Sequence, residues 1–380
     1  MQSSGLSAEE LFERGHELTY DDFTLLDTRF SAITKTEVSL NTYLGKGVEL
    51  ALPILAAPMD SLVSPEMAIA IARLGGIAVI HYNHRDTEGN PNINKQVEEI
   101  RRVKRAQNGF IENPITVSPE MTIAQVIERG RQNKISDEPI STFPVTQDGQ
   151  SNGRLVGLLR KDDYFRGSRT ESKVKDRMLG LEKLITRKVG ITLEEAQEVL
   201  WSGHVKSLPI IDEKGNLAYL VTRGDIEKRE QFPNATVDEN GRLRVLFAVN
   251  TWPESYERLE RGFAAGADGV VVDTSQGFGK FPFDMLRHIA AKYANKLLIG
   301  GNISTAEAAI ALSKLGFVDA YRCGQGSGSI CTTADAIGIG RAGAAGVYEC
   351  ARAVKEESSN MVTIADGGLR SAGDIFKALA

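Results

Sequence analysis

The sequence predicts an α/β fold in which a parallel sheet or barrel is interrupted by a second, smaller α+β domain. Short apolar runs rich in β-branched residues alternate with segments whose apolar positions recur every three or four residues. This alternation is typical of buried parallel strands joined by helices. Residues 111–232 break the alternation and contain two copies of one shorter pattern, which indicates an internal duplication within the larger fold.

Seven strands are expected in the parallel sheet, each followed by a small or polar loop. They lie at residues 54–56, 77–80, 245–249, 269–272, 297–299, 318–321 and 362–365. Helices are predicted at residues 66–74, 254–265, 282–293, 305–315 and 345–356. A (β/α)8 TIM barrel has eight strands, and only the start of a helix follows the seventh predicted strand before Ala380. We therefore expect a TIM barrel with seven visible strands and the eighth missing.

The interruption contains a duplicated βαββα unit. The first copy has segments 114–117, 122–126, 143–145 and 158–163, which are echoed by segments 184–186, 192–196, 208–212 and 220–225. This pattern resembles a tandem pair of cystathionine-β-synthase-like (CBS) motifs. The predicted domains are therefore residues 1–110, the N-terminal part of the barrel; residues 111–232, the tandem CBS domain; and residues 233–380, the C-terminal part of the barrel.

The CBS resemblance implies a regulatory site for purine nucleotides such as ATP or GTP. Thr222 and Asp225 match the positions at which members of that family meet the ribose and phosphates. In the first copy Arg160 stands where a hydroxyl is expected. A structural or oligomerising insertion that binds no ligand is the alternative interpretation.

Composition and charge exclude several classes of protein. Lysine and arginine number 45 against 50 aspartates and glutamates, a net charge of −5, which argues against nonspecific binding of nucleic acid through phosphate neutralisation. No apolar stretch approaches the roughly 18 residues that a membrane span needs. The N-terminal residues are polar and carry no secretory signal, and the three cysteines are too few for a disulfide framework. We expect a cytoplasmic protein.

Polar and glycine-rich residues gather where the predicted strands end, at residues 57–61, 81–83, 273–277, 300–302, 323–333 and 366–368. In a barrel the chemistry lies at this end of the strands. The sixth loop has three glycines spaced by two, Gly324, Gly326 and Gly328, which let the backbone approach a ligand closely. In the second loop His81 either lines the pocket or is a hydrogen-bonded structural histidine.

Cys331 in the sixth loop is the candidate nucleophile. A lone cysteine is more often a small buried hydrophobe, but a glycine-, serine- and threonine-rich loop at a strand end favours catalysis. Cys323 and Cys350 are expected to be structural. No histidine or carboxylate is adjacent to Cys331 in sequence, so its activation must come from the fold or from the ligand.

Taken together, the motifs resemble the IMP dehydrogenase family, in which a CBS pair interrupts the barrel at this point. They lie at residues 18–23, 58–60, 273–277, 300–302, 326–333 and 365–368. The resemblance implies NAD-dependent oxidation of inosine 5′-monophosphate (IMP) to xanthosine 5′-monophosphate (XMP), the first committed step of guanine nucleotide synthesis. Cys331 would add to C2 of the purine to form a thioimidate-type intermediate, and Thr333 would help to orient or activate water.

The resemblance also implies a set of binding residues. On the substrate side these are Ser329 and the backbone of Gly368 for the phosphate, Asp366 for the ribose hydroxyls, and Asn302 and Met59. Asp273, Ser275 and Gly324 match positions on the NAD side, and the carbonyls of Gly326, Gly328 and Cys331 match half of a potassium site. Asp273 and Asp366 could instead be strand-end caps that satisfy loop amides.

Some positions depart from the family pattern. Ala334 stands where the family usually has arginine, glutamine or glutamate, Ala342 and Gly343 stand in place of a Pro-Gln pair, and Ala57 replaces a common serine. The family's second phosphate loop and mobile flap are expected beyond Ala380. Two alternatives stay open: a GMP reductase, which shares the cysteine loop and uses NADPH, and a catalytically inactive nucleotide-sensing paralogue. The insertion favours the dehydrogenase, and the family implies a homotetramer that forms octamers through the CBS pairs.

Overall fold

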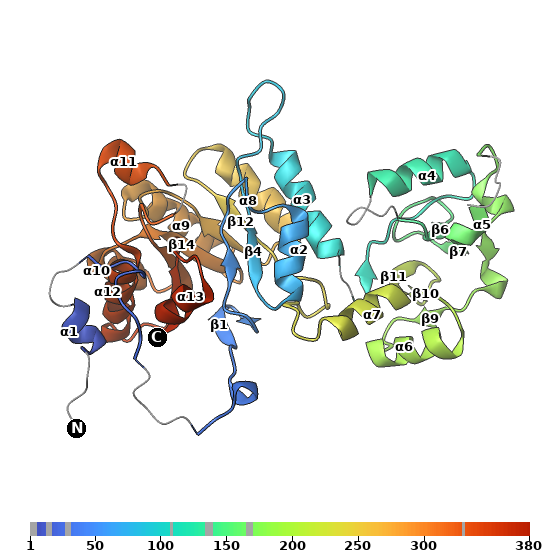
Figure 1. The fold of residues 1–380 in the computed structure, drawn as a ribbon. Helices are drawn as coiled ribbons and strands as arrows, with labels where there is room; N and C mark the ends of the chain where they lie inside the picture. The colour runs from blue at the N-terminus through green and yellow to red at the C-terminus, as the bar shows by residue number, and fades with distance from the viewer. Residues whose placement is uncertain are drawn as a thin grey trace. The chain divides into compact units, whose positions relative to one another are not determined.

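A computed structural model describes residues 6–12, 17–26, 32–106, 109–133, 140–164, 170–328 and 331–380. The chain splits into two compact units (Figure 1). The first consists of Met1–Ile100 and Val245–Ala380, and the second of Arg101–Arg244. The limits predicted for the inserted domain, residues 111 and 232, lie inside the second unit. Within the described ranges, no helix has the length and apolar character needed to cross a membrane.

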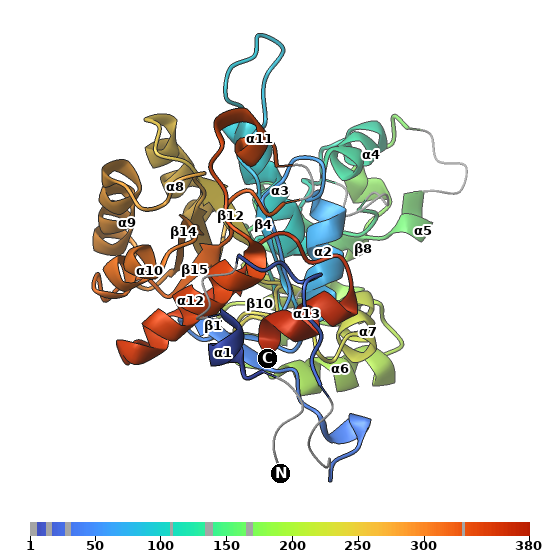
Figure 2. The ribbon, with the colours of Figure 1, turned by 60° about the vertical axis from the view of Figure 1, so that its left-hand side comes forward.

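The first unit is built on a parallel sheet with helices between its strands. Its elements are α1 (Ala8–Phe12), η1 (Lys35–Glu37), β1 (Thr42–Gly45), β2 (Val48–Leu50), β3 (Leu55–Ala56), α2 (Pro65–Arg73), β4 (Ile77–Ile80), α3 (Ile93–Arg105), β12 (Leu246–Val249), α8 (Glu254–Ala264), β13 (Gly269–Val272), α9 (Lys280–Lys292), β14 (Leu297–Ile303), α10 (Ala306–Ser313), β15 (Ala320–Cys323), α11 (Thr333–Ile337), α12 (Gly343–Glu356), β16 (Val362–Ala365) and α13 (Ala372–Leu379). The residues of α3 from Arg101 onward belong to the second unit. Helices α8, α9, α10 and α12 lie on the outer side of the curved sheet (Figure 2).

The seven predicted strands form one sheet in chain order, β3-β4-β12-β13-β14-β15-β16, and every neighbouring pair is parallel. This confirms the prediction of a barrel-type α/β fold with seven visible strands. β14 is longer than predicted because it continues to Ile303, where its register against β15 shifts between Gly301 and Ile303. The two glycines and Asn302 do not have the side chains by which a strand is usually recognised.

The core of this unit lies on the inner face of the sheet. In β4 all four residues are buried, and Ile77 and Val79 belong to the inner cluster with Leu246, Val271 and Ile299. Because side chains of a strand alternate between its two faces, Ala78 and Ile80 face the surrounding helices. Full burial of each such valine or isoleucine stabilises the fold by about 1.5–3 kcal/mol. The sheet is therefore a rigid support for the loops that leave its carboxyl end.

The second unit contains two similar halves. Its elements are β5 (Ile111–Glu112), α4 (Ile123–Gln132), β6 (Phe143–Thr146), β7 (Leu155–Leu159), α5 (Lys161–Tyr164), η2 (Val174–Asp176), β8 (Leu179–Gly180), η3 (Leu181–Lys183), β9 (Arg187–Lys188), α6 (Leu193–Ser202), β10 (Ser207–Ile211), β11 (Leu217–Thr222) and α7 (Arg223–Gln231). One sheet has the order β6-β7-β8 and the other β5-β11-β10-β9.

Each half repeats the same local design. α4 and α6 begin at a threonine, Thr122 and Thr192, whose hydroxyl accepts a hydrogen bond from the helix in a capping box. An antiparallel hairpin follows each helix, β6–β7 in one half and β10–β11 in the other, and leads directly into a second helix. Each half also has its own buried apolar cluster. The repeat seen in the sequence therefore has a counterpart in the order and packing of the elements.

Candidate active site

Loops at the carboxyl end of the parallel sheet enclose a cleft of about 1970 Å³. Ten of the residues expected to form the site line it, namely Met59, Ser275, Asn302, Gly324, Gly326, Gly328, Cys331, Thr333, Asp366 and Gly368. Ser329, the predicted phosphate ligand, lies outside the described residues. The volume exceeds the ~300–1,000 Å³ typical of a pocket for one small ligand, so the cleft has room for two ligands side by side.

The loop after β15 can approach β16 only because Gly324 has no side chain. Gly324 has a φ of +155°, and a Cβ at this position would lie 2.0 Å from the carbonyl oxygen of Asp366. Ser327 Oγ donates a hydrogen bond of 2.9 Å to the same carbonyl oxygen. The two strand exits are thereby joined, and residues from the sixth and seventh loops share one wall of the cleft.

Cys331 lies just before α11, with its sulfur close to a hydroxyl. Sγ of Cys331 and Oγ1 of Thr333 are 3.3 Å apart and form a hydrogen bond. Hydrogen bonding of Cys331 with the Thr333 hydroxyl and backbone, together with the backbone of Gly326, holds the pKa of the Cys331 thiol below its usual range. The hydroxyl two residues further along the chain is therefore the largest of the causes that lower the pKa of the Cys331 thiol.

The two other cysteines are unsuited to chemistry in the cleft. Cys323 and Cys350 are both buried, whereas Cys331 is partly exposed. The neighbouring Cys350 side chain and burial raise the pKa of Cys323 above its usual range. Since the thiolate is the nucleophilic form, Cys331 is the one of the three whose environment favours reactivity.

Arg322 on β15 brings the two predicted aspartates together. Its side chain is only 8% exposed, and Nη2 donates to Asp366 Oδ2 at 2.8 Å while Nη1 donates to Asp273 Oδ1. Burial raises the pKa of Asp273, and the charge and hydrogen bond of Arg322 oppose this without cancelling it. Both carboxylates therefore pair with a buried guanidinium. Arg322 and Asp366 line the cleft, whereas the predicted cofactor ligand Asp273 is not among its lining residues.

Asn302 completes this polar cluster. Its side-chain Nδ2 donates to the carbonyl oxygen of Gly324 at 2.8 Å and to Oδ2 of Asp366. Exits of β14, β15 and β16 are thus connected by one hydrogen-bonded group. The sequence analysis missed Arg322, although a charged residue inside a buried strand is a usable signal, because such a residue must be paired.

Tyr20 and Gln325 are further cleft residues that the sequence analysis did not identify. Tyr20 comes from the N-terminal segment, is 3% exposed, and its hydroxyl has no hydrogen-bond partner among the described residues. Burial raises the pKa of Tyr20 to about 12. Gln325 Nε2 donates to the carbonyl oxygen of Ser275 at 2.8 Å and to Oε1 of Gln276 at 2.7 Å. The predicted Ser275 is therefore held by its backbone against the sixth loop.

Thr222 and Asp225 lie together at the start of α7 in the second unit. Thr222 Oγ1 donates to Asp225 Oδ2 at 2.5 Å and accepts from the Asp225 backbone N–H at 3.2 Å. In the other half the equivalent carboxylate, Asp163, is bound by Arg160, with Nε at 3.0 Å and Nη2 at 2.8 Å. The two halves therefore differ: an arginine donates to both oxygens of one carboxylate, whereas a hydroxyl and, at 3.7 Å, the Lys228 ammonium contact the other.

The fold and the cleft define a class, an α/β barrel-type enzyme with a partly exposed cysteine on a glycine-rich loop. Comparison with known proteins narrows the class. Residues 17–380 match the IMP dehydrogenase / GMP reductase domain. The chain therefore belongs to this family of oxidoreductases.

Curated relatives support this assignment. The inosine-5′-monophosphate dehydrogenase of Aquifex aeolicus is 39% identical over 363 residues, covering 96% of this chain and 70% of that protein. The enzyme of the same name from Streptococcus pyogenes serotype M3 is 39% identical over 362 residues, covering 95% of this chain and 70% of the relative. That of Staphylococcus saprophyticus is 36% identical over 372 residues, 98% of this chain and 72% of the relative.

Solved structures with a similar fold carry a different name. GMP reductase from Trypanosoma brucei in complex with guanosine 5′-triphosphate has a TM-score of 0.87 and 32% identity, covering 96% of this chain and 84% of that one. A cysteine-to-alanine variant of the same reductase, in complex with guanosine 5′-monophosphate, also has a TM-score of 0.87 and 32% identity, over 96% of this chain and 74% of the other.

Proposed function

We propose that the chain catalyses the NAD-dependent oxidation of IMP to XMP, with Cys331 as the covalent nucleophile. The observation that carries the proposal is the Cys331–Thr333 pair, a thiol with a lowered pKa in a cleft large enough for a nucleotide and a cofactor. The purine C2–H is a poor hydride donor until a thiolate makes that carbon tetrahedral, so covalent catalysis divides one hard step into two.

The chain's own residues account for the chemistry at C2. The Cys331 thiolate forms a bond to C2, and NAD, when bound, takes up the hydride that leaves this carbon. The result is a thioimidate on Cys331, which water attacks at C2 with loss of a proton, and release of the sulfur gives XMP. Thr333 suits a role in orienting this water, because its hydroxyl lies beside the sulfur.

Asp366 suits the ribose of the substrate. A carboxylate accepts several hydrogen bonds, and Arg322 and Asn302 both bond to Oδ2, which leaves Oδ1 for ribose hydroxyls. We assign Asn302 and Met59 to the same side, with the backbone of Gly368 and the side chain of Ser329 at the phosphate. The position of Gly368 supports its assignment to the phosphate: it lines the cleft, and its φ of +75° is a backbone conformation that glycine adopts readily.

NAD and potassium would occupy the other predicted positions. We assign Asp273, Ser275 and Gly324, around the exits of β13 and β15, to the cofactor ribose. Ser275 and Gly324 line the cleft, and Asp273 is paired with Arg322, which also lines it. The carbonyls of Gly326, Gly328 and Cys331 are oxygen ligands of the kind that a hard cation such as potassium prefers. The Gly328 carbonyl accepts a 3.0 Å hydrogen bond from Cys331 N–H, which leaves one of its two lone pairs for the ion.

The second unit is proposed to be a tandem CBS domain that binds a purine nucleotide, ATP or GTP, at Thr222 and Asp225. The difference between the halves supports one site per chain. Arg160 donates to both oxygens of Asp163, whereas Asp225 has the Thr222 hydroxyl at 2.5 Å and the Lys228 ammonium at 3.7 Å as neighbours. The T. brucei GMP reductase, which matches 96% of this chain, has been solved with guanosine 5′-triphosphate bound. We expect the nucleotide to regulate activity in the first unit.

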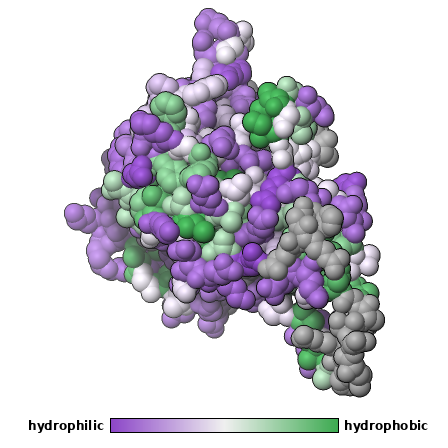
Figure 3. All heavy atoms as spheres, turned by 90° about the vertical axis from the view of Figure 1, so that its left-hand side faces the viewer, coloured by the Kyte–Doolittle hydropathy of each residue, from purple (hydrophilic) through white to green (hydrophobic). Residues whose placement is uncertain are grey.

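We propose a cytoplasmic homotetramer, with octamers formed through the second unit. Large apolar side chains at the surface support self-association, among them Phe376 at 66% and Leu379 at 57% exposure on α13. Figure 3 shows a face of the molecule on which a hydrophobic patch is surrounded by hydrophilic residues. Apolar patches of this kind mark interaction sites on many proteins.

GMP reduction with NADPH is the second candidate, and the solved T. brucei structures favour it. The presence of the inserted unit does not separate the two activities as the sequence analysis expected, since a GMP reductase matches 96% of the chain. Parallel assays of IMP with NAD and of GMP with NADPH distinguish them. Turnover of GMP alone would replace the dehydrogenase proposal, and nucleotide binding without either turnover would favour the inactive nucleotide-sensing paralogue.

A further inference from the structure

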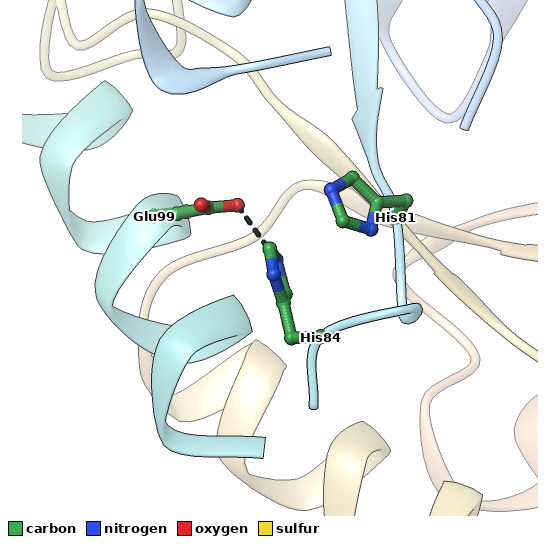
Figure 4. Close-up of side chains that lie close together, drawn as sticks. All are labelled: His81, His84 and Glu99. Atoms are coloured by element: carbon green, nitrogen blue, oxygen red, sulfur yellow. Dashed lines mark hydrogen bonds and ion pairs between the residues drawn. The ribbon is translucent and has the colours of Figure 1, made fainter. Parts of the chain in front are cut away.

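Two histidines and a glutamate lie together outside the proposed active site. His81 follows the last residue of β4, His84 lies three residues further along the loop, and Glu99 is on α3. Figure 4 shows the three side chains pointing toward a common space between strand, loop and helix. None of the three lines the cleft that holds Cys331, so the cluster needs a separate explanation.

The distances suit shared coordination of one ion. One potential ligand atom from each residue lies within 4.8 Å of the other two, and His84 Nε2 is already 2.9 Å from Glu99 Oε2. In a tetrahedral zinc site with bonds of about 2.0–2.1 Å, neighbouring ligand atoms are separated by about 3.4 Å. Small side-chain rotations therefore bring all three atoms to coordinating distance.

Burial and charge also favour a cation here. His81 and His84 are each 5% exposed, and their ring centroids lie 4.1 Å apart. A neutral imidazole is the form that binds metal. Glu99 provides one negative charge, and a divalent ion bound by these ligands would leave a net charge of only +1.

Hydrogen bonds hold the rings before any ion arrives. His81 Nδ1 accepts a 3.1 Å hydrogen bond from the Asn83 backbone N–H. His84 Nε2 is hydrogen-bonded to Glu99 Oε2, and a metal ion bound at Nε2 would replace the proton between these two atoms. Binding through Nε2 of His81 would move its proton to Nδ1 and release the Asn83 contact. Metal binding thus exchanges two hydrogen bonds, His84–Glu99 and Asn83–His81, for metal bonds.

We infer that His81, His84 and Glu99 form a binding site for a divalent transition-metal ion such as Zn²⁺, with water in the fourth position. Two imidazoles and one carboxylate are a ligand set that zinc accepts. The ion would connect the loop after β4 to α3. Its effect is structural, because the three ligands tie together segments that precede and follow the projecting loop between β4 and α3 (Figure 1).

Cobalt titration of the untagged, chelator-treated full chain tests the site directly, because Co²⁺ bound to such ligands has visible absorption bands. We expect saturation at one Co²⁺ per chain, displacement by Zn²⁺, and a higher unfolding temperature with Zn²⁺ than with chelator. Glu99→Gln and His84→Gln should each weaken binding at least about tenfold. Absence of saturable binding to the unmodified chain would overturn the inference whatever the variants do.

Matched controls separate this site from adventitious histidine binding. His204 and His288 lie outside the cluster, and His204→Gln and His288→Gln should leave the cobalt spectrum and affinity unchanged. If the His288 or His204 variant loses binding while Glu99→Gln and His84→Gln keep it, the inference is wrong. Circular dichroism of each variant in chelator identifies any that fails to fold, and the titration of the unmodified chain decides the question independently.

Discussion

Arg322 Nη2 lies 2.8 Å from Asp366 Oδ2, so a guanidinium inside β15 is bonded to the carboxylate at the exit of β16. Arg322 also contacts Asp273 at the exit of β13. Three strand ends are connected by one buried cation, which positions the two carboxylates proposed to hold the riboses of substrate and cofactor. This cluster and the Cys331–Thr333 pair form the proposed catalytic site together.

Replacement of Arg322 should damage both stability and binding. Arg322→Met removes the cation and leaves two largely buried carboxylates close together, which we expect to cost about 3–5 kcal/mol in unfolding free energy. KM for both IMP and NAD should rise, because Asp273 and Asp366 would repel each other and move. Urea unfolding and steady-state kinetics measure the two effects. Arg287→Met is the control, because it breaks a pair with Asp284 in which both side chains are about half exposed. This variant should change the free energy of unfolding by less than about 1 kcal/mol. An equally mild effect of Arg322→Met would contradict the role given to Arg322.

Alkylation of Cys331 should report its lowered pKa. The thiolate is the reactive form, so the rate of iodoacetamide labelling should rise with pH and reach half its plateau below the ordinary thiol pKa of 9.0. Thr333→Val removes the hydroxyl hydrogen bond, which should move this midpoint upward. Peptide mapping by mass spectrometry follows Cys331 separately, with buried Cys323 and Cys350 as slow internal references. A midpoint that does not move in Thr333→Val would exclude Thr333 as the activating group.

Nucleotide binding should depend on one half of the second unit. Asp225→Ala in the full chain should weaken ATP or GTP binding by at least about tenfold, since a buried carboxylate that contacts ribose hydroxyls is lost. Asp163→Ala is the matched control, because Arg160 already occupies that carboxylate, and it should leave the affinity nearly unchanged. Isothermal titration calorimetry gives affinity and stoichiometry. Equal losses in the two variants, or two nucleotides per chain, would refute a single site at Thr222 and Asp225.

The buried pair Lys104–Asp238 should make the second unit sensitive to acid. Burial alone would raise the pKa of Asp238. The ammonium of Lys104 at 2.9 Å, together with the backbone N–H and charge of Arg242, outweighs burial. The pKa of Asp238 therefore lies below its ordinary value of 3.8. The pair therefore contributes stability in full above pH 3.8, and the contribution is lost as the pH falls through the lower folded-state pKa.

Asp238→Asn tests this contribution. The variant should unfold at lower urea concentration than the unmodified chain at neutral pH, by about 3 kcal/mol, and the difference should shrink below pH 3.8. Unfolding curves at several pH values, followed by circular dichroism, give the comparison. Asp284→Asn, an exposed carboxylate, should show little difference at any pH. A constant difference for Asp238→Asn across this range would show that its charge is not the cause.

The sequence predicts the strands of the barrel well, since segments such as Ile77–Ile80 and Gly269–Val272 are apolar on both faces and have no other stable environment than a covered sheet. It also predicts Cys331 as the candidate nucleophile, because the cysteine lies in a glycine-rich loop at the end of a strand, where the chemistry of a barrel is found. The sequence does not predict pairings between distant segments. Arg322 meets residues 49 and 44 positions away, and His84 and Glu99 are brought together only by the return of α3 along β4.

Formation of reduced nicotinamide from IMP and NAD, measured in potassium buffer for the unmodified chain and for Cys331→Ala, tests the proposed reaction most directly. The account predicts IMP-dependent NAD reduction by the unmodified chain, with Cys331 recovered as a purine adduct when the reaction is quenched. Cys331→Ala should bind IMP and produce no reduced cofactor. An alanine variant as active as the unmodified chain, or turnover without any adduct at Cys331, would contradict covalent catalysis by this cysteine.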